Sequence, residues 1–355
     1  MAADSGATAA HRPDSGDTMP LVEAVLQQSR LDALAACDAN VTRYDPNSFL
    51  LIFRCRGRQM PFVIKPLLVL MVWAVAWSLI FERFEHIRAT IMPLEDLITP
   101  LLTPVSFLLV FRLGRSATRY WDARAAAGKL VQACRQMASS ASASCASQPV
   151  LVDGIARWLC VLPVAVKNFL RPAPRPGSPM VTRRQQQRAE LGALLTDAEA
   201  DELLDSGSTH PGGLGPLLVL IRLRQLAFRA ADESQGVRAD AAVRAVIFRN
   251  LSEHIDTLTG AWGAMERINA TPLPFAYVVH LRTFLVLYLL AWNLEALAVH
   301  GWPAFPALVV VDWALLGIEA AAVECERPFS WDANHLALGR MGVVVSQNVG
   351  QTLRC

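Results

Sequence analysis

Residues 102–111 read Leu-Thr-Pro-Val-Ser-Phe-Leu-Leu-Val-Phe, and this apolar stretch decides how the chain is interpreted. Thr103, Phe107 and Phe111 are spaced four residues apart, so in a helix they lie roughly on one face. A narrow apolar face with aromatic rings, followed by cations, is what a hydrophobic anion pore would need. The simpler alternative, which spacing alone favours, is that both phenylalanines pack between helices. The cations that follow are Arg112, Arg115 and Arg119.

The composition favours a membrane protein. Hydrophobic residues make up 53% of the 355 residues and charged residues only 18%, whereas soluble domains are usually about a quarter charged. The net charge of +2 is too small to indicate a nucleic-acid partner. The seven cysteines are scattered without a CxxC pair, so we expect reduced thiols and no metal site.

Four segments are candidates for membrane spans, although none is a clean run of the roughly 20 apolar residues that a span needs. Charged residues interrupt the third and the fourth segments. Because charges facing lipid are costly, we expect these helices to pack around one another or around water. A soluble helical core would give segments of similar length, and that alternative stays open here. The segments are Pro66–Phe81, Leu97–Phe111, Pro274–Val299 and Trp302–Val323.

The charges that flank these segments predict one topology. Arginine and lysine are concentrated before the first segment, after the second and after the fourth. The loop over residues 82–96 has two arginines against four acidic residues, and the short connection at residues 300–301 has neither lysine nor arginine. The positive-inside rule therefore places both termini and the long middle region on the cytoplasmic or stromal side.

The sequence as a whole predicts an all-α membrane protein. We expect a disordered tail over residues 1–48, in which residues 20–37 could form a short helix. The middle region has helical periodicity broken by a proline-rich run at residues 171–179, and strand-like alternation is missing. The resulting domain plan is a tail at 1–48, spans one and two at 49–111, a cytosolic or stromal helical region at 112–272, spans three and four at 273–325, and a C-terminal segment at 326–355.

Catalytic motifs are missing from the sequence. It contains no GxSxG, no HExxH, no P-loop and no dinucleotide fingerprint. The seven histidines never pair at the spacing of metal ligands. We therefore expect neither an enzyme nor a cofactor.

Several motifs, taken in order along the chain, resemble the bestrophins, in particular the bestrophin-like anion channels of bacteria, algae and plant chloroplasts. Each motif is weak alone, but five in family order are strong. One departure is Cys55, where the family has Trp in its Phe-Arg-Trp-Arg-Gly stretch. The matching stretches are residues 49–57, residues 104–107 with Phe111, residues 111–112 with 119–124, residues 271–282, and residues 317–319 with 328–334.

The resemblance implies a homopentamer around one central pore, with four spans and a cytosolic helical region in each subunit. The second span would line the neck, where Thr103, Phe107 and Phe111 match the three neck positions. Thr103 departs from the usual Ile or Val, and a polar ring there would make the neck wetter and less selective. Further along the pore, Leu217 after Pro216 is the best match to the apolar cytosolic aperture.

Elementary physics is compatible with an anion path through such a neck. Aromatic ring edges carry partial positive charge and would point toward the ion, and an apolar ring can gate by dewetting. Pro104 within the second span should free a carbonyl group and bend the pore helix, which is tolerable only inside a protein assembly.

One stretch bears on regulation. Animal bestrophins carry an acidic run after the Pro-Phe motif that helps to form a calcium clasp, whereas residues 330–335 here contain a single carboxylate, Asp332. Calcium prefers six to eight oxygen ligands, several of them carboxylates. We therefore predict no calcium clasp of that kind.

The function expected from the sequence is an anion channel that passes chloride or other small monovalent anions, with bicarbonate as a further candidate. The channel would be an integral, multi-pass protein of the lipid bilayer, and a plastid (thylakoid), plasma or bacterial membrane would each fit. A non-conducting membrane scaffold or auxiliary subunit with the same fold is the alternative. A third reading is a soluble helical bundle.

Overall fold

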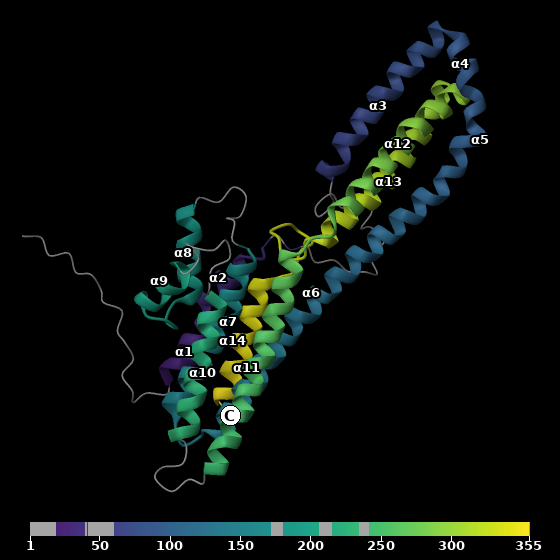
Figure 1. Ribbon diagram of the computed structural model, residues 1–355. Coiled ribbons are helices and arrows are strands. Elements are labelled where there is room, and N and C mark those ends of the chain that lie inside the picture. The colour runs from purple at the N-terminus through teal and green to yellow at the C-terminus, as the bar shows by residue number, and fades with distance from the viewer. Residues whose placement is uncertain are drawn as a thin grey trace, which may run out of the picture. The chain divides into compact units, whose positions relative to one another are not determined.

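The computed structural model describes residues 19–39, 41, 60–171, 180–205, 215–233 and 241–354, and within these ranges every regular element is a helix. The chain forms two compact units (Figure 1). One comprises residues 40–126 and 264–336 and is called the span unit below. The other comprises residues 1–39, 127–263 and 337–355 and is called the α7 unit, after its central helix.

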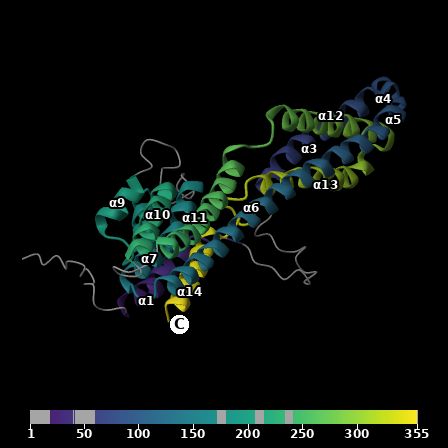
Figure 2. The ribbon, with the colours of Figure 1, turned by 60° about the horizontal axis from the view of Figure 1, so that its bottom comes forward.

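The span unit contains the predicted membrane helices. Figure 2 shows α3, α12 and α13 lying alongside one another, in agreement with their mutual contacts. Its elements are α3 (Met60–Arg83), α4 (Glu85–Ile91), η2 (Met92–Leu94), α5 (Glu95–Ile98), η3 (Thr99–Leu101), the first part of α6 (Leu102–Ser144), the end of α11 (Ala241–Ala270), α12 (Phe275–His300), η5 (Trp302–Ala304) and α13 (Phe305–Glu326).

The span unit has an apolar core and also an apolar exterior. Val105 and Leu109 of α6 pack in the core with Leu285 and Leu289 of α12. On α3, by contrast, the side chain of Val72 is 70% exposed and lies in a stripe of exposed apolar residues with Leu68 and Leu79. Contiguous exposed apolar surface of this kind marks contact with a membrane or with another protein.

Three of the predicted spans match single helices closely, namely α3, α12 and α13. The second span differs, because it begins in α5 and η3 and then continues without a break into α6, which runs on to Ser144. Each of the four has the length and composition of a membrane helix. Of the charged residues that interrupt them, Glu295, Asp312 and Glu319 are buried as expected, whereas His280 is exposed and the side chain of Arg282 is 43% exposed.

The α7 unit is built around one buried helix. The helix α7 contacts α1, α8, α10 and α14, and its residues Ile155, Leu159, Leu162 and Val166 are fully buried. Its length and composition would also allow α7 to cross a membrane, but 67% of the most apolar stretch of this helix is buried inside the protein. The elements of this unit, besides the rest of α6 and α11, are α1 (Met19–Leu26), α2 (Gln28–Ala36), α7 (Pro149–Leu170), α8 (Met180–Leu191), α9 (Asp197–Asp205), α10 (Gly215–Glu233) and α14 (Leu338–Arg354).

Three features of the structure bear on the predicted domain plan, whose membrane and cytosolic boundaries stay predictions. Residues 19–36 form α1 and α2, which pack against α14, so this part of the expected disordered tail is ordered. The C-terminal segment contains α14, which belongs to the α7 unit. Residues 112–126 and 264–272, predicted to be cytosolic, cluster with the spans. The predicted entry motif at residues 49–57 lies outside the described residues.

Candidate pore-lining site

The three predicted neck residues lie on one exposed face of α6. Thr103 is exposed, and the side chains of Phe107 and Phe111 are 62% and 50% exposed. The two phenylalanine rings meet edge to face, with their centroids 4.5 Å apart. Val105 and Leu109, on the opposite face, are buried in the core. Within the described chain the two phenylalanines therefore do not pack in the core of their own unit.

This exposed face continues past the neck residues and becomes polar. Val110 is exposed beside the phenylalanines, and a Cβ atom added to Gly114 would meet nothing within 4 Å. Arg115 and Thr118 then follow on the exposed side. The face thus changes from a threonine through apolar rings to a cation along its length.

Arg112 points away from this face, although the sequence suggested a cation at the pore mouth. Its side chain is fully buried and donates to Glu319 Oε2 at 3.4 Å and to Glu326 Oε2 at 2.7 Å. The other oxygen of Glu319 accepts from Arg282 at 2.7 Å. Because these groups come from α6, α12 and α13, the ion cluster holds the three helices together one residue after Phe111.

Arg119 is also engaged inside the span unit. Its guanidinium donates to the carbonyl oxygens of Ile268, Thr271 and Glu326, at 2.6 Å for Thr271 and 2.9 Å for Glu326. Terminal carbonyl groups of a helix lack intrahelical partners, and a cation near them is favourable. Of the three arginines after the neck, Arg115 is therefore the one left on the exposed face.

Pro104 lies in the first turn of α6, as its third residue. The 3-10 turn η3 (Thr99–Leu101) precedes it and continues without a break into α6. The bend of the pore helix expected at Pro104 stays a prediction.

Leu217, the candidate for the second constriction, belongs to the α7 unit and not to the unit that carries the neck residues. It is the third residue of α10 and partly exposed. With Ile221 and Phe228 it lines a cavity of about 770 Å³ between α10 and α11. Three arginines share this cavity, namely Arg222, Arg224 and Arg229.

A small cluster at the end of α13 has the donor types of a metal site. The ligand atoms of Glu324, Asp332 and His335 lie within 4.8 Å of one another. Asp332 is the single carboxylate of residues 330–335, and Glu324 lies eight residues before it along the chain. Two carboxylates and one imidazole still offer fewer oxygen atoms than calcium prefers, so the absence of a calcium clasp stays a prediction.

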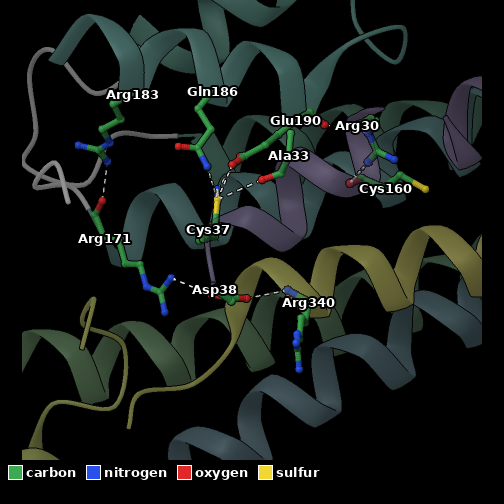
Figure 3. A network of polar contacts seen from close by, with 11 residues as sticks. Arg30, Ala33, Cys37, Asp38, Cys160, Arg171, Arg183, Gln186, Glu190 and Arg340 are labelled. Carbon is green, nitrogen blue, oxygen red and sulfur yellow. Dashed lines mark hydrogen bonds and ion pairs between the residues drawn. The ribbon is translucent and has the colours of Figure 1, made fainter. Parts of the chain in front are cut away.

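A buried polar network also lies in the α7 unit (Figure 3). Lys167 donates to Glu190 at 2.5 Å, and the Cys37 thiol donates to the other oxygen of Glu190 at 2.7 Å. Burial raises the pKa of Cys37 to about 12, so the thiol stays protonated and unreactive. The network joins α2, α7 and α8, and we interpret its role as structural.

Comparisons with known proteins agree with this architecture. Residues 40–351 match the family model described as bacterial/fungal bestrophin protein. A voltage-dependent anion channel-forming protein of Synechocystis is 24% identical over 84% of this chain and 89% of its own length. One from Mesorhizobium japonicum, with the same description, is 28% identical over 88% of this chain and 92% of its own length.

Solved structures share the fold. The crystal structure of a bacterial bestrophin homologue from Klebsiella pneumoniae has a TM-score of 0.66 and 20% identity to this chain, and the match covers 82% of this chain and 98% of that one. Together these matches indicate a channel and not an enzyme. Because the family model spans most of its length, the chain belongs to the bacterial and fungal bestrophin family.

Proposed function

We propose that this protein is a membrane channel for chloride and other small monovalent anions, with α6 lining the neck of its pore. The observation that carries the proposal is the exposed face of Thr103, Phe107 and Phe111 on α6. Its relatives are named as voltage-dependent anion channel-forming proteins, which supports the same activity here.

A single α6 face cannot enclose an ion path, so several copies must surround it. Closed rings of identical subunits are the usual way to build such a path. The resemblance to bestrophins implies that five subunits surround the pore. In a ring, the exposed rings of Phe107 and Phe111 would face their symmetry mates across a narrow lumen.

The chemistry of this face suits anions. The edge-to-face contact of the two rings presents partly positive ring edges. Arg115 adds a full positive charge beyond the apolar section. The threonine ring at position 103 would admit water more easily than a ring of Ile or Val, which favours weak discrimination among small anions, bicarbonate included.

A second constriction in the α7 unit completes the proposed path. Leu217 would form the apolar aperture on the cytoplasmic or stromal side, and the arginines beside it would raise the local anion concentration. The basic flanks of the spans support this orientation, with both termini on that side.

Current across a planar bilayer tests the proposal. Purified protein under a tenfold chloride gradient should give a reversal potential near the chloride equilibrium value. A pentameric, membrane-inserted protein that stays silent at all voltages would instead support a non-conducting scaffold. Bicarbonate substitution then measures the ratio of the two permeabilities.

The neck assignment has its own test. Phe107→Ala combined with Phe111→Ala should ease gating and raise conductance, because the apolar ring widens and dewets less readily. Assembly should change little, since neither ring is in the core. Leu68→Ala, an exposed position on α3, is the matched control. Conductance and selectivity equal to the parent in the double variant would contradict the neck assignment.

A further inference from the structure

A cavity of about 590 Å³ lies in the span unit, lined mainly by α3 and α13 and also by Leu113 of α6. Its wall is apolar along most of its length, formed by Met60, Val63, Trp313 and Ile318. Gly317 lies midway along it, and a Cβ atom there would meet nothing within 4 Å. The volume is within the range of sites that hold a small molecule or part of a lipid, roughly 300–1,000 Å³.

One end of the cavity carries a carboxylate that lacks a full set of partners. Glu324 lines the cavity and is only 9% exposed. Asn334 hydrogen-bonds to this carboxylate, but Oε1 has no hydrogen-bond donor among the described residues. The nearest cationic candidate, His335 Nε2, is 4.0 Å from Oε1. A buried carboxylate oxygen without a donor is costly, so a donor from outside the chain would be favourable.

The surroundings decide which kind of donor fits. An anionic headgroup would be repelled by Glu324 and by the neighbouring Asp332. A metal ion on His335 Nε2 would require the ring proton on Nδ1, but Nδ1 accepts a hydrogen bond from the Asp332 backbone N–H at 2.9 Å. A primary ammonium supplies both a positive charge and N–H donors, and it needs neither histidine nitrogen.

We propose that this cavity binds a bilayer lipid whose headgroup carries a primary ammonium, with the ammonium donating to Glu324 Oε1 and the acyl chain lying against Trp313 and Ile318. The proposal rests on the proposed function only in placing α3 and α13 in a bilayer. It assigns Glu324 to lipid binding and gives it no part in conduction.

The test is quenching of tryptophan fluorescence by lipids with brominated acyl chains in nanodiscs. Phosphatidylethanolamine and phosphatidylcholine with identical brominated chains are compared, because phosphatidylcholine lacks N–H donors. The fluorescence of Trp313 is obtained as the difference between the fluorescence of the parent protein and that of Trp313→Phe. We expect that phosphatidylethanolamine quenches half of the Trp313 signal at a mole fraction about tenfold lower than phosphatidylcholine does. A tenfold difference is the usual effect of one charge-assisted hydrogen bond.

Two variants separate the headgroup contact from the cavity. Glu324→Gln keeps the shape and should remove the difference between the two lipids. Gly317→Leu fills the cavity and should reduce quenching by both lipids. Gly260→Leu, on α11 and equally open, controls for the substitution itself.

The outcomes are distinct. Equal quenching by both lipids in the parent protein overturns the proposal, and so does a lipid preference that survives in Glu324→Gln. A change of assembly size in Gly317→Leu would assign the cavity to a neighbouring copy instead. Conduction is measured separately, so a silent protein with a clear lipid preference would overturn the channel proposal alone.

Discussion

The two units of this protein bury similar groups but expose different ones. The span unit presents exposed apolar side chains along α3 and α13, such as Val72 and Val310. The α7 unit keeps its long apolar helix inside and places pairs such as Arg184 with Asp201 on its surface. The α7 unit also exposes apolar side chains, such as Phe228 and Ile221, so the two exteriors differ in how apolar and charged groups are mixed.

The interiors are alike in one respect, since each unit contains a buried ion cluster that joins three helices. In the span unit, Arg112 and Arg282 pair with Glu319 and Glu326, and in the α7 unit Glu190 pairs with Lys167 and accepts from Cys37 at the end of α2. A buried pair contributes little net stability, but removing one partner leaves an uncompensated charge. Both clusters therefore specify which helices meet.

The largest effect should come from Arg112→Gln. This change leaves Glu326 without its guanidinium and Glu319 with Arg282 alone, which should cost about 3–5 kcal/mol. Thermal unfolding in detergent and the assembled fraction on a sizing column measure the loss. Arg115→Gln, on the exposed face of the same helix, is the control. Equal stability of the two variants would show that the buried cluster is not a structural clamp.

A lysine placed on the exterior of each unit tests the comparison most directly. Val72→Lys on α3 should destabilise the inserted protein by about 2.5–3.5 kcal/mol, the cost of a charge within a bilayer. Val344→Lys, at a partly exposed site on α14, should change stability by no more than about 0.5 kcal/mol. Membrane insertion and unfolding of the two variants are measured side by side. Similar effects at both sites would remove the distinction between the two exteriors.

A close approach inside the α7 unit gives the next effect. A Cβ atom at Gly339 would overlap the Leu34 carbonyl oxygen and lie 2.9 Å from Asp38 Oδ2. Gly339→Ala should therefore separate α14 from α2 and destabilise the unit by about 1–3 kcal/mol. The control is Gly260→Ala, where nothing lies within 4 Å. Unchanged protease resistance of residues 19–36 in Gly339→Ala would contradict the packing described here.

The smallest effect concerns pH. His254 on α11 lies 3.0 Å from Ser140 Oγ, and burial lowers its pKa below the ordinary value of 6.5, partly offset by Glu253. The unfolded chain then takes up the proton at a higher pH than the folded protein. Stability should therefore fall modestly as the pH drops below about 6.5. The midpoint of thermal unfolding should change less between pH 7.5 and pH 5.5 in His254→Gln than in the parent protein.

Much of the span unit could be predicted from sequence, because hydropathy and flanking charge are local signals. The starts and ends of α12 and α13 follow the apolar runs within a few residues. The common face of Thr103, Phe107 and Phe111 could also be predicted, since residues at this spacing share a face in any regular helix, and its role as a pore neck stays a proposal. The solvent exposure of these three side chains could not be predicted from the sequence, because it depends on which faces of α6 the other helices cover.

The missed features all depend on contacts between distant residues. A short helix within residues 20–37 was expected, but its packing partner α14 was not, because α14 lies some three hundred residues away along the chain. Arg112 was taken for a cation at the pore mouth, because nothing local reveals Glu319 and Glu326 as its partners. The boundary between membrane and cytosol placed at residue 112 stays a prediction, since α6 continues helically across it.

The division of the α7 unit into three separate stretches of chain has a consequence for biosynthesis. The first stretch leaves the ribosome before any span has been made, yet α1 and α2 rest on α14, which is translated near the end. The nascent chain must therefore keep an unfinished hydrophobic surface protected while the whole span unit is being inserted. Contacts this distant in sequence form slowly, so the dependence on chaperones should be greatest just before α14 emerges.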